Sequence, residues 1–399
     1  MWQNIKNYYH LLQAIAANIF YGFPAKHLTV IGVTGTDGKT TTTSLIYHIL
    51  KNAGYKSSMV STISAVINGN VKEFGLHVTT PEPFTLQKCL RQAADAGSKY
   101  MVLEVTSHAL DQHRVFGIPF TVSVLTNITR EHFDYHKTYE NYVSAKVKLL
   151  EISRVAVVNM DDESYKSISN LKSQISNVQW VTYGMGSDSD INPNIFPFKT
   201  KLLGEFNRYN ILAAIAVCRN LGISDNTIQD GITNFKLPVG RMEVVHEDEF
   251  TVMIDFAHTP NALKQVLTTT RSIMKNNGRL IHVFGSAGER DKGKRSQMGE
   301  VSNQFAHIII LTADDPRSES VDKISDEIAA GITSVKKIHK IPDRQEAINE
   351  AIKLAAPEDF VVITGIGHVR AMPVSGKEIP WSEHEAVAQA LKLKVKNEK

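Results

Sequence analysis

Residues 28–42 read LTVIGVTGTDGKTTT. The first six residues are apolar and rich in β-branched types, which predicts a short buried strand. A glycine-rich turn follows, and apolar residues then recur at helical spacing over residues 41–53. A strand, a glycine-rich loop and a helix in this order predict a phosphate-binding loop at a helix N-terminus.

The residue types in this loop suit a nucleoside triphosphate. Glycines let backbone N–H groups turn towards an anion. The Lys39 ammonium can reach the β- and γ-phosphates, and a threonine hydroxyl can hold Mg²⁺. The strict G-x-x-x-x-G-K-[ST] pattern is not met, because Val33 stands five residues before Gly38. We expect a variant loop that binds ATP through Gly35, Thr36, Asp37, Gly38, Lys39, Thr40 and Thr41.

Strand and helix patterns alternate along the rest of the chain, which predicts two α/β domains with mostly parallel sheets. Residues 29–238 form the predicted central ATP-binding domain, and residues 239–399 a C-terminal domain of dinucleotide-fold-like class. The predicted strands are 28–33, 100–105, 121–125, 155–159, 252–255, 280–284, 307–311 and 360–364. The predicted helices are 41–53, 85–96, 139–150, 204–221, 261–274, 295–305, 321–330 and 344–354.

Composition excludes several classes of protein. The chain has 399 residues, of which 42 % are hydrophobic and 21 % are charged, which is ordinary for a globular protein. A formal net charge of +3 gives no sign of a nucleic-acid-binding protein. The 2 cysteines are far apart, which excludes a disulfide framework and a thiolate zinc site and fits a reducing cytoplasm.

The first 28 residues precede the predicted strand and have an amphipathic pattern. The apolar run over residues 11–23 contains Gln13 and Asn18, and it is too short to cross a membrane. Two interpretations remain. The helix packs on the next domain, or it lies at a membrane interface through aromatic residues, namely Trp2, Tyr8, Tyr9 and Tyr21.

Polar residues cluster at and after the predicted strand 100–105. Glu104 closes that strand, where a carboxylate faces the phosphate loop of a parallel sheet. A carboxylate beside a nucleotide suits Mg²⁺. Arg114, with hydroxyl and amide neighbours, suits a carboxylate substrate. Lys146, taken alone, is typical of a surface lysine on a helix.

The loop GVTGTDGKTTT, together with LEVTSH, QHR, TNITREHFDYH and DDPR in the same order, resembles the Mur ligases. The resemblance extends from Thr29 to Ala390. It is strongest to the branch that adds the third residue of the peptidoglycan peptide, the UDP-N-acetylmuramoyl-tripeptide synthetases. It implies a cytoplasmic, ATP- and Mg²⁺-dependent amide ligase of cell-wall synthesis that works through an acyl phosphate. The acceptor would be UDP-MurNAc-L-Ala-D-Glu.

The resemblance also implies roles for individual residues. The metal would be held by Thr40, Glu104, His132 and a carbamylated Lys146. The catalytic residues would be Lys39, Glu104, His132, Lys146 and Arg241. ATP would further be contacted by Asn207, Asn210, Arg241, Asp255 and His258. Substrate would be bound by Thr79, Thr80, Ser107, Gln112, Arg114, Arg290, Asp314, Asp315, Arg317 and Gly365.

Two positions depart from the pattern of the ligases that add meso-diaminopimelate. Arg317 matches the arginine that binds the distal carboxylate of that amino acid. Asp315 stands where asparagine is usual, and Val369 stands where a glutamate would bind the distal ammonium. We expect meso-diaminopimelate as the added residue, with Val369 arguing against the usual pocket.

Only 28 residues precede the predicted ATP domain, which is too short for the family's uridine-nucleotide-binding domain. We therefore expect a partner chain to supply that domain, fewer contacts to the nucleotide, or a different acceptor. One alternative is a related ligase with a folylpolyglutamate-like or cyanophycin-like acceptor. Another is a non-catalytic ATP-binding subunit, against which the intact Lys39, Glu104, His132 and Lys146 argue.

Overall fold

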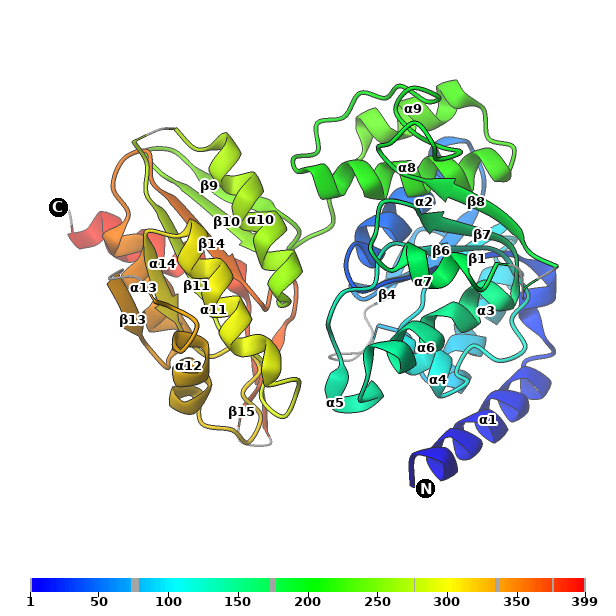
Figure 1. Cartoon of the computed structure of the whole chain (residues 1–399), viewed down its shortest axis with the longest axis horizontal. Coiled ribbons are helices and arrows are strands. Elements are labelled where there is room, and N and C mark those ends of the chain that lie inside the picture. Colours follow the sequence, from blue (N-terminus) through cyan, green and yellow to red (C-terminus); the bar gives the residue numbers. More distant parts are fainter. Residues whose placement is uncertain are drawn as a thin grey trace. The chain divides into compact units, whose positions relative to one another are not determined.

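The computed structural model describes residues 2–72, 79–172, 175, 177–275, 277–333, 337–374 and 377–397 (Figure 1). The chain forms two compact units. The first comprises Met1–Thr129 and His136–Pro238, and the second comprises Arg130–Tyr135 and Val239–Lys399.

The first unit is built on an eight-stranded sheet of order β4-β3-β2-β5-β1-β6-β7-β8. The strands from β2 to β8 in this order run parallel, while β3 and β4 add antiparallel at one edge. Their bounds are β1 Thr29–Thr34, β2 Ser57–Val60, β3 Ala65–Ile67, β4 Asn70–Lys72, β5 Tyr100–Glu104, β6 Phe120–Leu125, β7 Ser153–Asn159 and β8 Gln179–Tyr183.

Helices cover both faces of this sheet, so its central strands are apolar on both sides. One face packs against α2 (Lys39–Asn52), α8 (Glu205–Asn220) and α9 (Asp225–Asn234). The other packs against α3 (Pro83–Asp95), α4 (Ser107–Asp111) and α6 (Tyr139–Glu151). The remaining helices are α1 (Trp2–Phe20), the 3-10 turn Pro24–His27, α5 (Phe133–His136) and α7 (Tyr165–Ser169).

The second unit has a six-stranded sheet of order β13-β12-β11-β14-β10-β9, in which only the edge strand β9 is antiparallel. A hairpin of β15 and β16 is separate from it. The strands are β9 Glu243–Glu247, β10 Thr251–Asp255, β11 Leu280–Phe284, β12 Ile308–Leu311, β13 Lys337–Lys340, β14 Phe360–Thr364, β15 Ala371–Val374 and β16 Lys377–Pro380. The helices are α10 Pro260–Ile273, α11 Gly293–Phe305, α12 Val321–Ala329, α13 Arg344–Leu354 and α14 Glu383–Asn397.

The predicted α/β class is confirmed, with a mostly parallel sheet in the first unit and a mixed sheet in the second. α2 starts two residues earlier than predicted, because Gly38 takes the left-handed conformation that begins the helix. Cys89 and Cys218 are both buried and unbonded. No helix in the described ranges has the length and apolar character needed to cross a membrane.

Candidate functional site

The loop between β1 and α2 is shaped around two glycines. Gly35 has φ 148°, and a Cβ there would lie 1.8 Å from Thr126 Oγ1. Gly38 has φ 81°, and a Cβ there would lie 2.4 Å from Asn210 Oδ1. Glycine alone fits both positions without moving a neighbour. The N-cap residue of α2 is Gly38, which makes no side-chain capping hydrogen bond, and the N-terminus of a helix suits an anion.

Side chains from α2, from α6 and from the segment after β6 hold the rest of this loop. The Lys39 ammonium donates to Thr36 O at 2.8 Å, which places it over the loop. Asn127 accepts from Asp37 N at 2.9 Å and donates to Asp37 O at 3.1 Å. Thr36 Oγ1 lies 3.1 Å from the Tyr142 hydroxyl. The loop conformation is therefore set before any ligand arrives.

Glu104 lies at the carboxyl end of β5, paired in register with Val33 of β1. Its side chain is 1 % exposed and is surrounded by donors. Thr40 Oγ1 donates at 3.1 Å, while Thr62 donates from its backbone N and its hydroxyl, both at 2.8 Å. Thr62 Oγ1 also lies 3.1 Å from Thr79 Oγ1. The structure thus brings the predicted residues Thr40, Glu104 and Thr79 together.

The sequence context of Lys146 on α6, taken alone, indicated a surface lysine. The structure shows that Lys146 is buried. Its Nζ donates to Gly35 O at 2.5 Å and lies 4.5 Å from the centre of the Tyr142 ring. A buried lysine is costly unless it has partners, and here the Gly35 carbonyl oxygen and the Tyr142 ring supply them.

The predicted peptide-binding residues form a second cluster in the same unit. Arg114 donates to Thr80 O at 2.9 Å and to Gln112 Oε1 at 2.6 Å, and pairs with Glu82 at 2.9 Å. Ser107 Oγ lies 3.0 Å from His136 Nε2. Thr80 also donates to the backbone oxygen of Glu104 at 2.9 Å, which connects this cluster to the loop.

The predicted adenine contacts lie in the first turns of α8. Asn210 donates to Asn207 Oδ1 at 3.1 Å and accepts from Thr42 Oγ1 at 3.2 Å. Asn207 donates to Leu203 O at 2.7 Å. Both asparagines are buried, so α8 is fixed to α2 beside the phosphate loop.

In the second unit, three predicted residues surround Phe256. The Arg241 guanidinium stacks on its ring at 4.5 Å, and His258 Nδ1 lies 2.9 Å from its carbonyl oxygen. Asp255 accepts from Met242 N and from Ala257 N, each at 2.7 Å. The Asp255 carboxylate therefore orders the two segments that carry Arg241 and His258.

The predicted amino-acid site lies where β11, β12 and β14 end. Asp315 Oδ2 lies 3.4 Å from Arg317 Nε, and Arg317 has the left-handed φ of 51°. Gly365 has φ 108°, and a Cβ there would lie 2.5 Å from Asp314 Oδ2. Burial raises the pKa of Asp314 to about 6. Arg290 is partly exposed and pairs with Asp134 at 3.7 Å.

A buried ion pair contacts the backbone of the loops that carry Asp314 and Gly365. Arg344 and Glu383 are both fully buried and hydrogen-bonded to each other. Arg344 also donates to Ala313 O at 2.8 Å and to Thr364 O at 2.9 Å. One guanidinium thus ties together the loops that carry Asp314 and Gly365.

Comparisons with known proteins identify the family of the chain. The Mur ligase middle domain model matches residues 33–218, and the model for the Mur ligase glutamate ligase domain matches residues 240–367. The chain is 39 % identical over 394 residues to the UDP-N-acetylmuramoyl-L-alanyl-D-glutamate–2,6-diaminopimelate ligase of Aquifex aeolicus, covering 94 % of this chain and 80 % of the relative.

The chain belongs to the Mur ligase family.

Further relatives of this Mur ligase agree. The protein of the same name from Thermosynechococcus vestitus is 37 % identical, covering 95 % of this chain and 80 % of that one. A solved structure of a ligase of that name has a TM-score of 0.61 at 31 % identity, covering 92 % of this chain and 79 % of that one. E. coli FolC, in complex with DHPP and ADP, shares the fold, with a TM-score of 0.73 at 19 % identity and coverage of 98 % and 93 %.

Mur ligases use ATP and Mg²⁺ in general, and the first unit of this Mur ligase offers suitable ligands. Thr40 Oγ1 and the Glu104 carboxylate are adjacent oxygen donors beside the phosphate loop. Mg²⁺ takes one or two carboxylates, with phosphates and waters completing its octahedron. These residues fit the ion.

His132 is a separate case. It lies in the segment Arg130–Tyr135, which groups with the second unit, and has the left-handed φ of 59°. Within the ranges that the structure describes, no three His, Cys, Asp or Glu side chains form a metal-binding group. The role of His132 as a metal ligand therefore stays a prediction.

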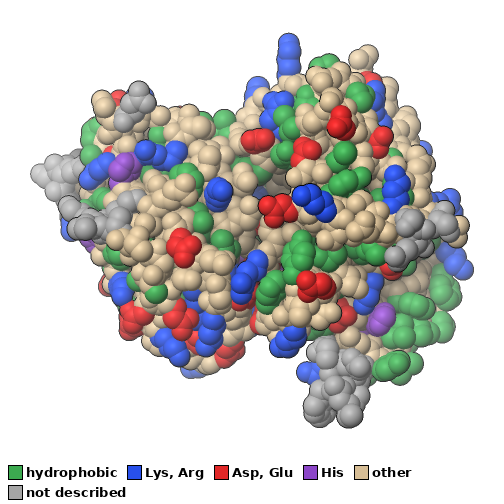
Figure 2. All heavy atoms as spheres, in the orientation of Figure 1, with side chains coloured by type: hydrophobic (Ala, Val, Ile, Leu, Met, Phe, Trp, Pro, Cys, Tyr) green, Lys and Arg blue, Asp and Glu red, His purple; other side chains and the backbone are tan. Residues whose placement is uncertain are grey.

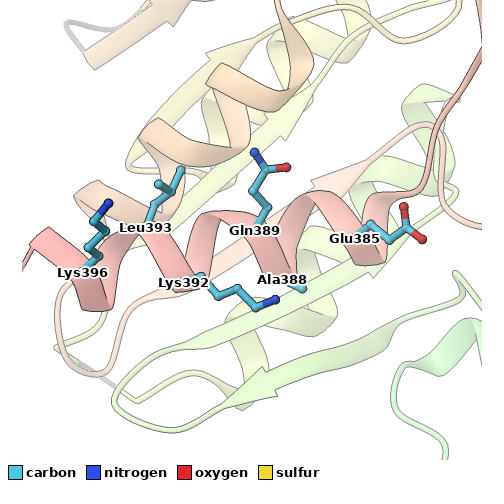
Figure 3. Close-up of a pocket in the computed structure, with 6 residues that line it drawn as sticks. All are labelled: Glu385, Ala388, Gln389, Lys392, Leu393 and Lys396. Atoms are coloured by element: carbon cyan, nitrogen blue, oxygen red, sulfur yellow. The ribbon is translucent and has the colours of Figure 1, made fainter.

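A groove elsewhere in the second unit is lined by residues of a single helix, α14 (Figure 3). These residues are Glu385, Ala388, Gln389, Lys392, Leu393 and Lys396. None of them was predicted for the site.

Two residues near the phosphate loop were missed by sequence analysis. Thr62 follows β2, a four-residue strand that the sequence did not reveal. Tyr142 precedes Lys146 by one helical turn, and that spacing was the available signal. Tyr142 contacts both Thr36 and Lys146, so it sets the geometry of both.

Proposed function

We propose that this Mur ligase joins meso-diaminopimelate to UDP-MurNAc-L-Ala-D-Glu, with ATP converted to ADP and phosphate. The observation that carries the proposal is the buried Glu104 carboxylate hydrogen-bonded to Thr40 beside a preformed phosphate loop. Relatives at 39 % and 37 % identity over most of the chain bear the name of this reaction.

The first step is proposed to be attack of the acceptor carboxylate on the γ-phosphorus of ATP, which releases ADP and forms an acyl phosphate. Lys39 and the N–H groups of α2 would neutralise charge on the phosphates. Thr40 and Glu104, with the predicted ligands His132 and carbamylated Lys146, would hold Mg²⁺, which would supply positive charge to offset that of the phosphates. Arg114 would orient the carboxylate-bearing acceptor.

In the second step the amine of the incoming amino acid attacks the acyl carbon, and phosphate leaves. Arg317 would hold the distal carboxylate of a diamino acid. Asp315, 3.4 Å from that guanidinium, limits the positive charge of Arg317. Val369, which stands where the family pattern has a glutamate, would add no charge to bind the distal ammonium.

The proposal is tested by phosphate release from ATP and Mg²⁺ in the presence of UDP-MurNAc-L-Ala-D-Glu. Amino acids are tested in parallel, with meso-diaminopimelate, lysine and glutamate as the central three. Release that requires both the acceptor and meso-diaminopimelate supports the proposal. Phosphate release that requires a folate as the acceptor and glutamate as the amino acid would replace both proposed substrates. That result would favour the related-ligase alternative.

We place the reaction in the cytoplasm, where ATP is supplied. Turnover that appears only when a second, uridine-nucleotide-binding chain is added would support the predicted partner. Tight ATP binding without turnover under any of these conditions would favour a non-catalytic subunit.

A further inference from the structure

The N-terminal helix α1 turns two asparagines and two alanines towards the protein and most of its large apolar side chains outwards. Asn18 is buried and donates to Phe116 O at 2.9 Å, and Asn7 donates to Asp111 Oδ2 at 2.9 Å. Ala14 and Ala17 fill the space between them. Surface helices normally show the reverse arrangement, with the apolar stripe facing the core.

The outward face carries large apolar side chains at successive helical turns. Tyr8 is 71 % exposed, Leu12 66 % and Ile19 65 %. Ile15 lies between them on the same face and is also exposed. Figure 2 shows hydrophobic side chains gathered over α1, at the lower right. We name this face, with Phe20, the α1 stripe.

The α1 stripe continues onto a second helix. Phe20 is 73 % exposed, and its ring centre lies 6.3 Å from that of Phe84 on α3, which is exposed as well. Phe23 and Phe116 are further exposed aromatic residues in the segments next to these helices. Contiguous exposed apolar surface of this kind marks an interaction site.

Charge around the stripe is one-sided. Residues 1–36 contain Lys6 and Lys26 but no aspartate or glutamate. The carboxylates that approach α1 are already paired, Glu82 with Arg114 at 2.9 Å and Asp111 with Lys148 at 3.3 Å. The surroundings of the stripe therefore favour an anionic partner.

We propose that the α1 stripe docks this protein onto an anionic lipid surface. An apolar, aromatic-rich helix face with nearby lysines, whose neighbouring carboxylates are paired with other cations, has the pattern of helices that lie in the membrane interface. The hydrogen bonds of Asn7 and Asn18 hold the other face to the first unit, so the helix lies along the surface while the domain stays outside the bilayer.

A second copy of the chain is a poorer occupant. At a rise of about 1.5 Å per residue, a stripe from residue 8 to residue 20 is about 18 Å long, and with a width of about 10 Å it covers roughly 200 Å². A stable dimer buries about 800 Å² on each partner. Lipid has no such threshold, because binding grows with buried apolar area and with electrostatic attraction to anionic headgroups.

The test is flotation of the purified full chain with vesicles. Vesicles of phosphatidylcholine alone are compared with vesicles containing about a third phosphatidylglycerol, at low and high salt. The test variant is Leu12→Gln with Ile19→Gln. The matched control is Ile152→Gln with Ile195→Gln, two residues of the same unit that are 47 % and 49 % exposed. Circular dichroism confirms that all three proteins are folded.

We expect the wild type and the control to float with anionic vesicles, and salt to weaken this binding. The test variant should bind at least about 10-fold more weakly, because two large apolar side chains are lost from the contact. An Ile15→Cys protein adds a direct readout. Since Cys89 and Cys218 are buried, a fluorophore at position 15 labels α1 alone and should shift to the blue on vesicles.

Three results would overturn the proposal. One is wild-type protein that stays in solution with every vesicle. Another is flotation lost equally in the test and control variants. The third is self-association, measured by analytical ultracentrifugation, that disappears in the test variant while no vesicle binding occurs, which would assign the stripe to a second copy.

Discussion

Replacing Glu104 by glutamine tests the proposed metal site with little change in volume. The carboxylate accepts hydrogen bonds from the Thr40 hydroxyl and from the backbone and hydroxyl of Thr62, and is 1 % exposed. Glutamine keeps one acceptor oxygen, but its NH₂ group must face at least one of these donors. We expect the first unit to lose about 1–3 kcal/mol of stability, the cost of leaving a buried donor unsatisfied.

The effect on turnover should be larger than the effect on folding. Glutamine removes the negative charge assigned to Mg²⁺, so we expect kcat to fall by about 100- to 1,000-fold. The Mg²⁺ concentration for half-maximal rate should rise by about 10- to 100-fold. The assay is phosphate release across a Mg²⁺ titration, with urea unfolding measured on the same samples.

The matched control is Asp95→Asn, which makes the same chemical change at an exposed carboxylate on α3 of the same unit. It should leave both the rate and the Mg²⁺ dependence unchanged. The reasoning is refuted if Glu104→Gln is folded and turns over at the wild-type rate at limiting Mg²⁺. A loss of rate that does not change with Mg²⁺ would remove Glu104 from the metal site.

Other perturbations test the buried Lys146 of α6, the pH dependence of the stability of the second unit, and the buried ion pair of that unit. Lys146→Ala should lower phosphate release by at least about 100-fold, because a charge assigned to the metal is lost; undiminished activity would remove the carbamate. Burial lowers the pKa of His282 to about 3, so its contribution to stability is complete above about pH 6.5 and is lost as pH falls towards 3. Burial raises the pKa of Asp314 to about 6, so its contribution is complete below about pH 4 and is lost as pH rises through 6. Between pH 4 and 6 the contributions of His282 and Asp314 to stability change in opposite directions with pH. In thermal unfolding, the stability of His282→Gln should therefore fall as pH rises, and the stability of Asp314→Asn should rise. Parallel profiles for the two variants would contradict this. Glu383→Gln should cost the second unit about 3–5 kcal/mol in urea unfolding, whereas Glu350→Gln at an exposed pair should cost less than about 1 kcal/mol; equal losses would show that burial is not the cause.

Much of the fold could be predicted because its central strands are buried on both faces. Runs such as residues 28–33 and 360–364 are largely apolar and rich in β-branched residues, which is typical of strands in parallel sheets. Short edge strands give no such signal. β4 is fully exposed and β13 reads KIHK, so neither has an apolar run to detect.

The site was predicted mainly where loops have distinctive glycines or charges. The phosphate loop and Glu104 follow from the position of a glycine turn and a carboxylate at the ends of parallel strands. Lys146 could not be found in this way, since its helix has a second lysine two residues later, at the half-exposed position 148, and the sequence does not distinguish the two. Only the folded chain places Lys146 Nζ against Gly35 O.

The central claim is that the acceptor carboxylate takes the γ-phosphoryl group of ATP. The most direct measurement uses UDP-MurNAc-L-Ala-D-Glu labelled with oxygen-18 in its reacting carboxylate, with unlabelled ATP, Mg²⁺ and meso-diaminopimelate. Mass spectrometry of the released phosphate should find one oxygen-18 atom per turnover. The reason is that phosphate leaves the acyl carbon together with the former carboxylate oxygen. Phosphate without the label, released at the same rate as amide product, would contradict the acyl-phosphate mechanism.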